Sequence, residues 1–141
     1  MGRVEDTIDQ LRCVDLFADL ETKVLLQIAL TGQEVVFGVG EDVVREGESG
    51  GWLYVMLEGE AVVTAGGVER ARLYGGDYFG EISLLDSEAR SATVTATTPV
   101  RAFSLASFNF RPLLEEHFEI AEQVILRLCQ RLRKLQAPPG G

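Results

Sequence analysis

The segment WLYVMLEGEAVVTAGGVERARLY, residues 52–74, decides the fold class. It contains three runs rich in Val, Leu and Tyr, and the breaks between them are EGE and GG. Glycine tolerates the positive φ angles of tight turns, so short runs with this punctuation are typical of strands joined by hairpins. We therefore expect three consecutive antiparallel strands in this segment.

Similar runs continue the pattern in both directions along the chain. QEVVF (33–37) and DVVRE (42–46) precede the segment, and SATVTAT (91–97) and VRAFSLA (100–106) follow it. Seven or so short strands separated by Gly-rich breaks predict an antiparallel sandwich or barrel. The fold class is thus expected to be mainly β.

Helical spacing flanks the β region on both sides. Apolar residues at steps of three to five predict two short helices before it, the second capped by Asp19, and the helical period returns at Ser107. The last helix is amphipathic, with an expected apolar stripe of Ala121, Val124, Ile125, Leu128, Leu132 and Leu135. The plan is a single domain over residues 1–137, with helices at 5–31, a β-roll at 33–105, helices at 107–136 and a flexible tail at 138–141.

Composition excludes several classes of function. A net charge of −9 argues against direct nucleic-acid binding. Apolar runs are shorter than the roughly 20 residues of a membrane helix, and the acidic start is unlike a signal peptide. We expect a cytoplasmic protein without membrane insertion. Cys13 and Cys129 lack the CxxC spacing and neighbouring His of a metal site, and we expect both to be reduced structural thiols, as in a cytosolic compartment.

The stretch FGEISLLDSEARSAT, residues 79–93, carries the candidate site. A short helix from Glu81 to Leu85, directly behind Gly80, would present backbone N–H groups and the positive end of its dipole to an anion. Arg90 follows Glu81 by nine residues and its planar guanidinium can pair with two phosphate oxygens, while Ser91 adds a hydroxyl. Glu81 suits a sugar hydroxyl, so the pattern indicates a nucleotide.

Each of these residues also has an ordinary structural explanation. Arg90 alone suits a surface ion pair with Asp86 or Glu88, and Glu81 alone suits a helix N-terminus. Their joint spacing favours a binding site.

An enzyme motif is also present by spacing. GESGG (47–51) fits G-x-S-x-G, and Asp86 and His117 follow in the chain order of an α/β-hydrolase triad. The next run, WLYVMLE, predicts a strand where a nucleophile elbow needs a helix. We expect no enzyme activity, and also no metal site, because His117 is the single histidine.

At this point a family resemblance emerges. GGDYFGEISLLDSEARSATVTA (75–96) resembles the phosphate-binding cassette of cyclic nucleotide-binding domains, and VVREGESGGWLYVMLEGEAVV (43–63) is similar to the strand pair that precedes it. The resemblance extends over roughly residues 11–135. It implies a jelly-roll β-roll, or double-stranded β-helix, with flanking helices, as in cAMP receptor protein, kinase regulatory subunits and cyclic nucleotide-gated channels.

The resemblance also implies roles for individual residues. Glu81 would take the ribose 2′-hydroxyl and Arg90 the cyclic phosphate. Supporting groups would come from Gly80, Ile82, Ser83 and Ser91. The base would lie near Leu73 under the last helix, where the lid candidates are Arg127, Leu128 and Arg131.

Ligand and output stay open at this stage. Ala89 stands where the family usually has Pro, which loosens the approach to Arg90 without removing a ligand group. Ser91 in place of Thr favours cAMP over cGMP. The family implies a regulatory domain that signals through its C-terminal helices, and the alternative is an interaction module of the same fold that does not bind cyclic nucleotides.

The chain is either a piece of a longer protein or acts on an unknown effector in trans. The Leu-rich last helix packs on its own roll, pairs with a second copy as a homodimer, or does both.

Overall fold

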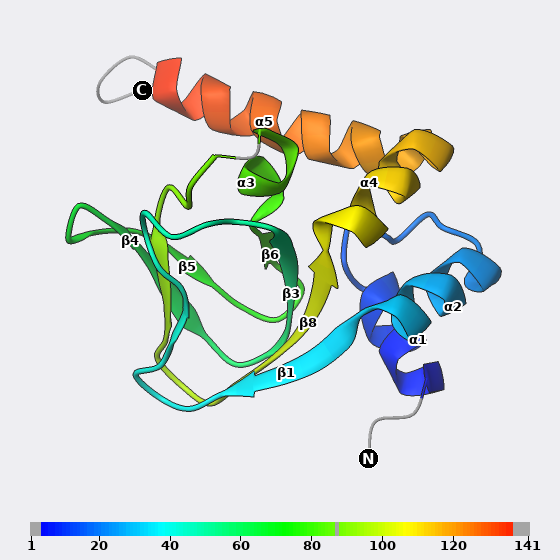
Figure 1. The fold of residues 1–141 in the computed structure, drawn as a ribbon, viewed down its shortest axis with the longest axis horizontal. Helices are drawn as coiled ribbons and strands as arrows, with labels where there is room; N and C mark the ends of the chain where they lie inside the picture. The colour runs from blue at the N-terminus through cyan, green and yellow to red at the C-terminus, as the bar shows by residue number, and fades with distance from the viewer. Residues whose placement is uncertain (1–3, 87, 137–141) are drawn as a thin grey trace.

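The computed structural model describes residues 4–86 and 88–136 (Figure 1). Within this part of the chain, two four-stranded antiparallel sheets form a jelly-roll β-roll with helices before and after it. The predicted mainly β fold with flanking helices is confirmed. The predicted tail at 138–141 lies outside the described residues. None of the described helices is long and apolar enough to cross a membrane.

The two sheets of the roll interleave strands that are far apart in sequence. The first has the order β1-β8-β3-β6 and the second β2-β7-β4-β5. Strands β3 and β8 form the longest pairing, from Trp52 opposite Ala106 to Glu58 opposite Arg101. The strands are β1 Gln33–Phe37, β2 Asp42–Val44, β3 Trp52–Glu58, β4 Ala61–Ala65, β5 Val68–Leu73, β6 Tyr78–Phe79, β7 Thr93–Ala96 and β8 Val100–Ala106.

Alternation along the strands of the first sheet creates two separate apolar cores. Successive side chains of a strand point to opposite faces. Met56 and Ala102 therefore face the interior of the roll, where they join Leu73, Phe79 and other buried residues. Their neighbours Leu53, Val55, Phe103 and Leu105 face outward, where helices cover them. Burial on both faces explains why β3 and β8 are almost continuously apolar.

Helices from both ends of the chain cover the outer face of the first sheet. These are α1 Val4–Arg12, α2 Thr22–Thr31, α4 Ser107–Glu116 and α5 Phe118–Gln136. Ile8 and Leu11 of α1, Ile28 of α2, Phe110 of α4 and Ile120 of α5 all join one core with the sheet. The remaining helix, α3 Glu81–Asp86, lies between β6 and β7 in the chain and under α5 in space (Figure 1).

Several local expectations need correction. Strand β6 is not among the strands that we predicted. It has only two residues, and its pairing with Tyr54 and Val55 of β3 holds it in the sheet. Asp19 does not cap α2. Glu21 occupies the N-cap position and makes no side-chain cap hydrogen bond. Cys13 and Cys129 are free thiols, as predicted, but both are exposed and so do not have the structural role that we expected.

The expected apolar stripe of α5 faces the core along one edge and solvent along the other. Val124 is buried and Leu128 packs against the core, and Ile120, which we did not include, is fully buried. Ile125, Leu132 and Leu135 are exposed. The helix therefore packs on its own roll through one edge of the stripe and leaves the other edge uncovered in the single chain.

Candidate functional site

A pocket of about 470 Å³ lies between the roll and α5. Its walls come from β2, β4, β5, β7, Asp77, residues 79–81, residues 90–92 and one face of α5. This volume is within the range of about 300–1,000 Å³ that is usual for small-molecule sites. The pocket therefore occupies the region in which the sequence predicted a ligand.

Gly80 sits at the bend between β6 and α3 and makes room for the site. Its φ is +96°, a conformation that side-chain-bearing residues rarely adopt. A Cβ at this position would lie 2.6 Å from Nη1 of Arg90 and 2.6 Å from the carbonyl oxygen of Trp52. Glycine is required here for both backbone and space.

The backbone of Arg90 is fixed by the loop that precedes β3. Its N–H donates to the carbonyl of Glu48 at 2.8 Å, and its own carbonyl accepts from the N–H of Gly47 at 2.9 Å. An isolated antiparallel bridge joins the neighbouring Ala89 to Ser49. The G-x-S-x-G segment is thus a structural clamp for Arg90, and it leads into strand β3, as predicted.

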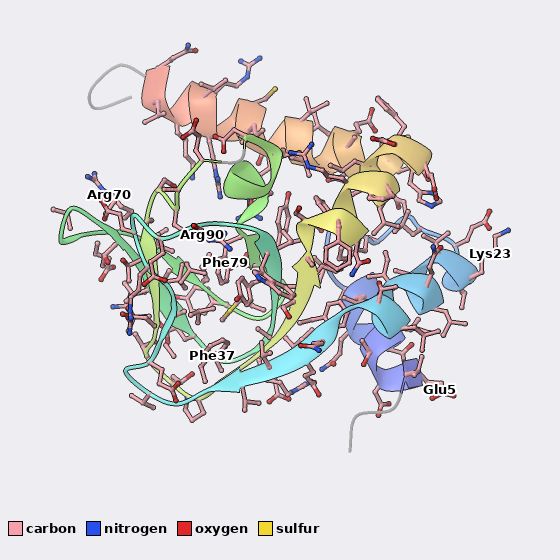
Figure 2. All side chains as sticks on the ribbon, in the orientation of Figure 1. Glu5, Lys23, Phe37, Arg70, Phe79 and Arg90 are labelled. Atoms are coloured by element: carbon pink, nitrogen blue, oxygen red, sulfur yellow. The ribbon has the colours of Figure 1, made fainter. Side chains whose placement is uncertain are left out.

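The side chain of Arg90 is buried, with 6% of its surface exposed. Nη2 donates to the carbonyl of Trp52 at 2.8 Å, and the guanidinium lies 6.0 Å from the ring centre of Tyr54. Nη1 is buried without a hydrogen-bond partner among the described residues. Burial lowers the pKa of Arg90 from its ordinary value, but an arginine remains charged. Figure 2 shows Arg90 beside Phe79 in the roll, where both residues line the pocket.

A buried cationic N–H without a partner is unfavourable, because its desolvation is not compensated. Nη1 of Arg90 therefore provides an unused, charged donor in a residue that lines the pocket. An anion with oxygen acceptors is the chemical partner that satisfies this donor.

Glu81 is the first residue of α3 and is 1% exposed. Its Oε1 lies 3.1 Å from Nη1 of Arg131 on α5, in an ion pair whose angles do not satisfy a hydrogen bond. Arg131 is more exposed, at 42% of its side chain, so solvent screens the pair. The contact joins the helix of the expected cassette directly to the last helix.

One face of α5 forms the outer wall of the pocket. Arg127 lies over the ring of Tyr78, with its guanidinium carbon 4.1 Å from the ring centre. Burial raises the pKa of Tyr78, so this phenol stays neutral at physiological pH. Arg127, Gln130, Arg131 and Lys134 all line the pocket, as expected for residues at helical spacing on one face.

The structure places most of the predicted site residues around this pocket. Leu73, Gly80, Glu81, Arg90, Ser91, Arg127 and Arg131 line it. Leu128 does not, because it packs into the core instead. Ile82 and Ser83 belong to α3, but their side chains lie outside the described part of the structure.

A family model described as "Cyclic nucleotide-binding domain" matches residues 34–117. The chain belongs to the cyclic nucleotide-binding domain family. The match covers the whole roll from Glu34 onward, the pocket residues contributed by the roll, and α4.

Relatives of this cyclic nucleotide-binding domain include an ion channel and a protein kinase. The chain is 39% identical over 120 residues to potassium/sodium hyperpolarization-activated cyclic nucleotide-gated channel 3 of Mus musculus, covering 85% of this chain and 15% of the channel. It is 50% identical over 91 residues to a cGMP-dependent protein kinase of Toxoplasma gondii, covering 64% of this chain and 9% of the kinase. The chain thus spans a small part of the length of either relative.

Solved structures show the same fold. The regulatory domain of Toxoplasma gondii PKA, co-crystallised with cAMP, superimposes with a TM-score of 0.82 at 25% identity. The match covers 91% of this chain and 50% of that one. The jelly-roll assignment therefore rests on both sequence and structure.

Sequence reasoning missed several residues that line the pocket or contact Arg90. Gln130 and Lys134 could have been found from Arg127, because steps of three and seven residues return to the same face of a helix. Arg70 and Ala71 of β5 also line the pocket, and no local signal marks them. Trp52 and Tyr54, which contact Arg90, come from a strand 36 to 38 positions earlier in the chain.

Proposed function

We propose that this protein is a regulatory cyclic nucleotide sensor whose preferred ligand is cAMP. The cyclic phosphate pairs with Arg90, and the ribose 2′-hydroxyl donates to Glu81. Gly80, Ile82, Ser83 and Ser91 lend backbone or hydroxyl groups, the base lies against Leu73, and Arg127 and Arg131 cover it. The observation that carries the proposal is the buried, unpartnered Nη1 of Arg90 in the same pocket as a buried carboxylate.

Known ligands of relatives support this assignment. The regulatory domain of Toxoplasma gondii PKA was crystallised with cAMP, and the channel relative is named as cyclic nucleotide-gated. Another relative is a cGMP-dependent kinase, so cGMP is the necessary comparison ligand. Ser91, where cGMP-preferring domains commonly carry Thr, supports cAMP as the favoured nucleotide.

Signalling follows from the contact between Glu81 and Arg131. A ligand hydroxyl that engages Glu81 changes the partner of Arg131, and thereby the position of α5 that is most stable. Ligand binding shifts the population of α5 positions because its affinity differs between them. No catalytic step is part of this mechanism.

The effector that responds to α5 is either a partner protein or another domain of a longer chain. The relatives are several times longer than the matched region, so an effector domain or a separate protein reads the position of α5. A second copy of this chain is a further partner. Phe118, Ile125 and Leu132 recur every seven residues on the exposed edge of α5, which is the spacing of a coiled-coil seam. A cytoplasmic site of action is consistent with two free thiols.

Calorimetric titration of nucleotide-free protein with cAMP and cGMP tests the assignment. Arg90→Ala should weaken cAMP binding by at least about tenfold, because it removes the phosphate partner. Arg90→Lys should restore part of the affinity, since it keeps the charge and loses the planar fork.

Arg133→Ala is the matched control, because Arg133 is exposed on α5 and does not line the pocket. It should bind like wild type. If Arg90→Ala also binds like wild type, the site assignment is wrong. If wild-type protein binds neither nucleotide, the chain is the interaction module of the same fold.

A further inference from the structure

The pocket carries far more positive charge than the rest of the molecule. The chain has 13 Lys and Arg against 22 Asp and Glu. Six of these cations line the pocket, with two carboxylates, Asp77 and Glu81. A cyclic mononucleotide brings a single negative charge on its phosphodiester. The pocket therefore has more cations than that ligand can match.

Four of the six cations already have a role within the site. Arg72 pairs with Glu60 at 2.8 Å and with Glu69 at 3.3 Å. Arg131 pairs with Glu81, and Arg127 lies over the ring of Tyr78. Arg90 is the proposed partner of the cyclic phosphate.

Arg70 and Lys134 remain, and neither forms an ion pair with another described residue. They come from opposite walls of the same pocket, Arg70 from β5 and Lys134 from the last turn of α5. Figure 2 shows Arg70 at the outer end of the roll, on the side where α5 ends. Both residues are exposed at the surface end of the pocket lining.

Helix stabilisation does not account for this pair. A lysine in the last turn of a helix is favourable to the helix dipole, which suffices for Lys134. Arg70 lies on a strand and gains nothing from that dipole. Both side chains are exposed, so solvent screens their mutual repulsion, and an anion bound between them would use the donors of both.

We propose that Arg70 and Lys134 form a second anionic subsite in the pocket, for a second phosphate beside the cyclic one. The ligand class is a nucleotide with two phosphodiesters, as in a cyclic dinucleotide, or a cyclic mononucleotide bound together with free phosphate. This inference rests on the proposed function, because it takes Arg90 as the site of the first phosphate.

The test compares wild type with the double variant Arg70→Gln/Lys134→Gln and with Arg133→Gln, a control from the same end of α5 that does not line the pocket. Each is titrated with cAMP, with cyclic di-AMP, and with cAMP in inorganic phosphate against chloride of equal ionic strength. We expect the double variant to lose at least about tenfold in affinity for cyclic di-AMP, or to lose the gain that phosphate gives to cAMP binding. Its affinity for cAMP in chloride should fall by less than its affinity for cyclic di-AMP, because cAMP has no second phosphate to engage Arg70 and Lys134.

The two arms distinguish the source of the second phosphate. Loss in the cyclic di-AMP arm identifies one ligand with two phosphodiesters, and loss in the phosphate arm identifies a free anion. If the double variant matches wild type in both arms while cAMP binds, the subsite does not exist and the proposed function stands. If cAMP itself fails to bind wild-type protein, the proposed function falls and the subsite with it.

Discussion

At the residue scale, the site depends on Gly80 lying directly beside the side chain of Arg90. Glu81 and Arg90 could be predicted from their spacing, because both lie in one continuous stretch. The space that Arg90 occupies could not, since it is defined by Gly80 together with the carbonyl of Trp52 from β3. Such contacts depend on how β3 and β6 pair, which no local pattern encodes.

Gly80→Ala should therefore weaken ligand binding more than the strain of a positive φ alone explains. The new Cβ would meet Nη1 of Arg90 at 2.6 Å and displace the guanidinium. Gly76→Ala is a close control, because Gly76 has a φ of +98° and a Cβ added there would meet no other atom within 4 Å.

Both variants should lose about 1–2 kcal/mol of unfolding free energy in urea titration, since both force alanine into a positive φ. Gly80→Ala should lose more than Gly76→Ala, because its Cβ also meets the carbonyl oxygen of Trp52 at 2.6 Å. In calorimetry, Gly80→Ala alone should lose at least about tenfold in cAMP affinity. Equal affinities for the two variants would mean that Arg90 is not constrained by this contact.

At the element scale, the positions of the strands were more predictable than the way in which α5 packs. Periodicity and glycine breaks located seven of the strands within a few residues. The two-residue strand β6 was missed because it exists through pairing with β3. The apolar stripe of α5 was recognised, but sequence alone could not show that Val124 faces the core while Leu132 faces away from it.

The exposed edge of α5 yields a prediction about self-association. Phe118, Ile125 and Leu132 have the seven-residue spacing of a coiled-coil seam. Leu132→Glu should raise the dissociation constant of a wild-type dimer at least about tenfold in sedimentation experiments, because it places a charge in the seam.

Leu126 provides the control for this experiment. It is exposed to 48%, against 55% for Leu132, but lies off the seam. Leu126→Glu should leave the dimer intact. A wild-type protein that stays monomeric up to about 100 μM would exclude a functional dimer at this edge.

At the scale of the whole molecule, charge is distributed unevenly. An acidic protein of net charge −9 has a pocket lined by six cations and two carboxylates. Overall composition predicted the acidity and could not reveal this concentration, since Arg70, Arg90 and Lys134 meet only after folding. A cleft of one sign attracts ligands of the other and speeds their association.

The association rate of cAMP should consequently fall with ionic strength. Stopped-flow measurements with a fluorescent cAMP analogue should show a drop of about tenfold or more between about 10 mM and 0.3 M salt. Arg12→Gln removes a charge far from the pocket lining and should keep the same dependence. A rate that does not change with salt would show that the pocket cations do not guide the ligand.

The two exposed thiols have a practical consequence for spectroscopy. Cys13 follows α1, and Cys129 lies on α5, which forms the outer wall of the pocket. The sequence contains no other cysteine. A donor and an acceptor dye can therefore be attached to the natural chain by maleimide chemistry, and energy transfer between them would report displacement of α5 relative to the N-terminal helices in real time.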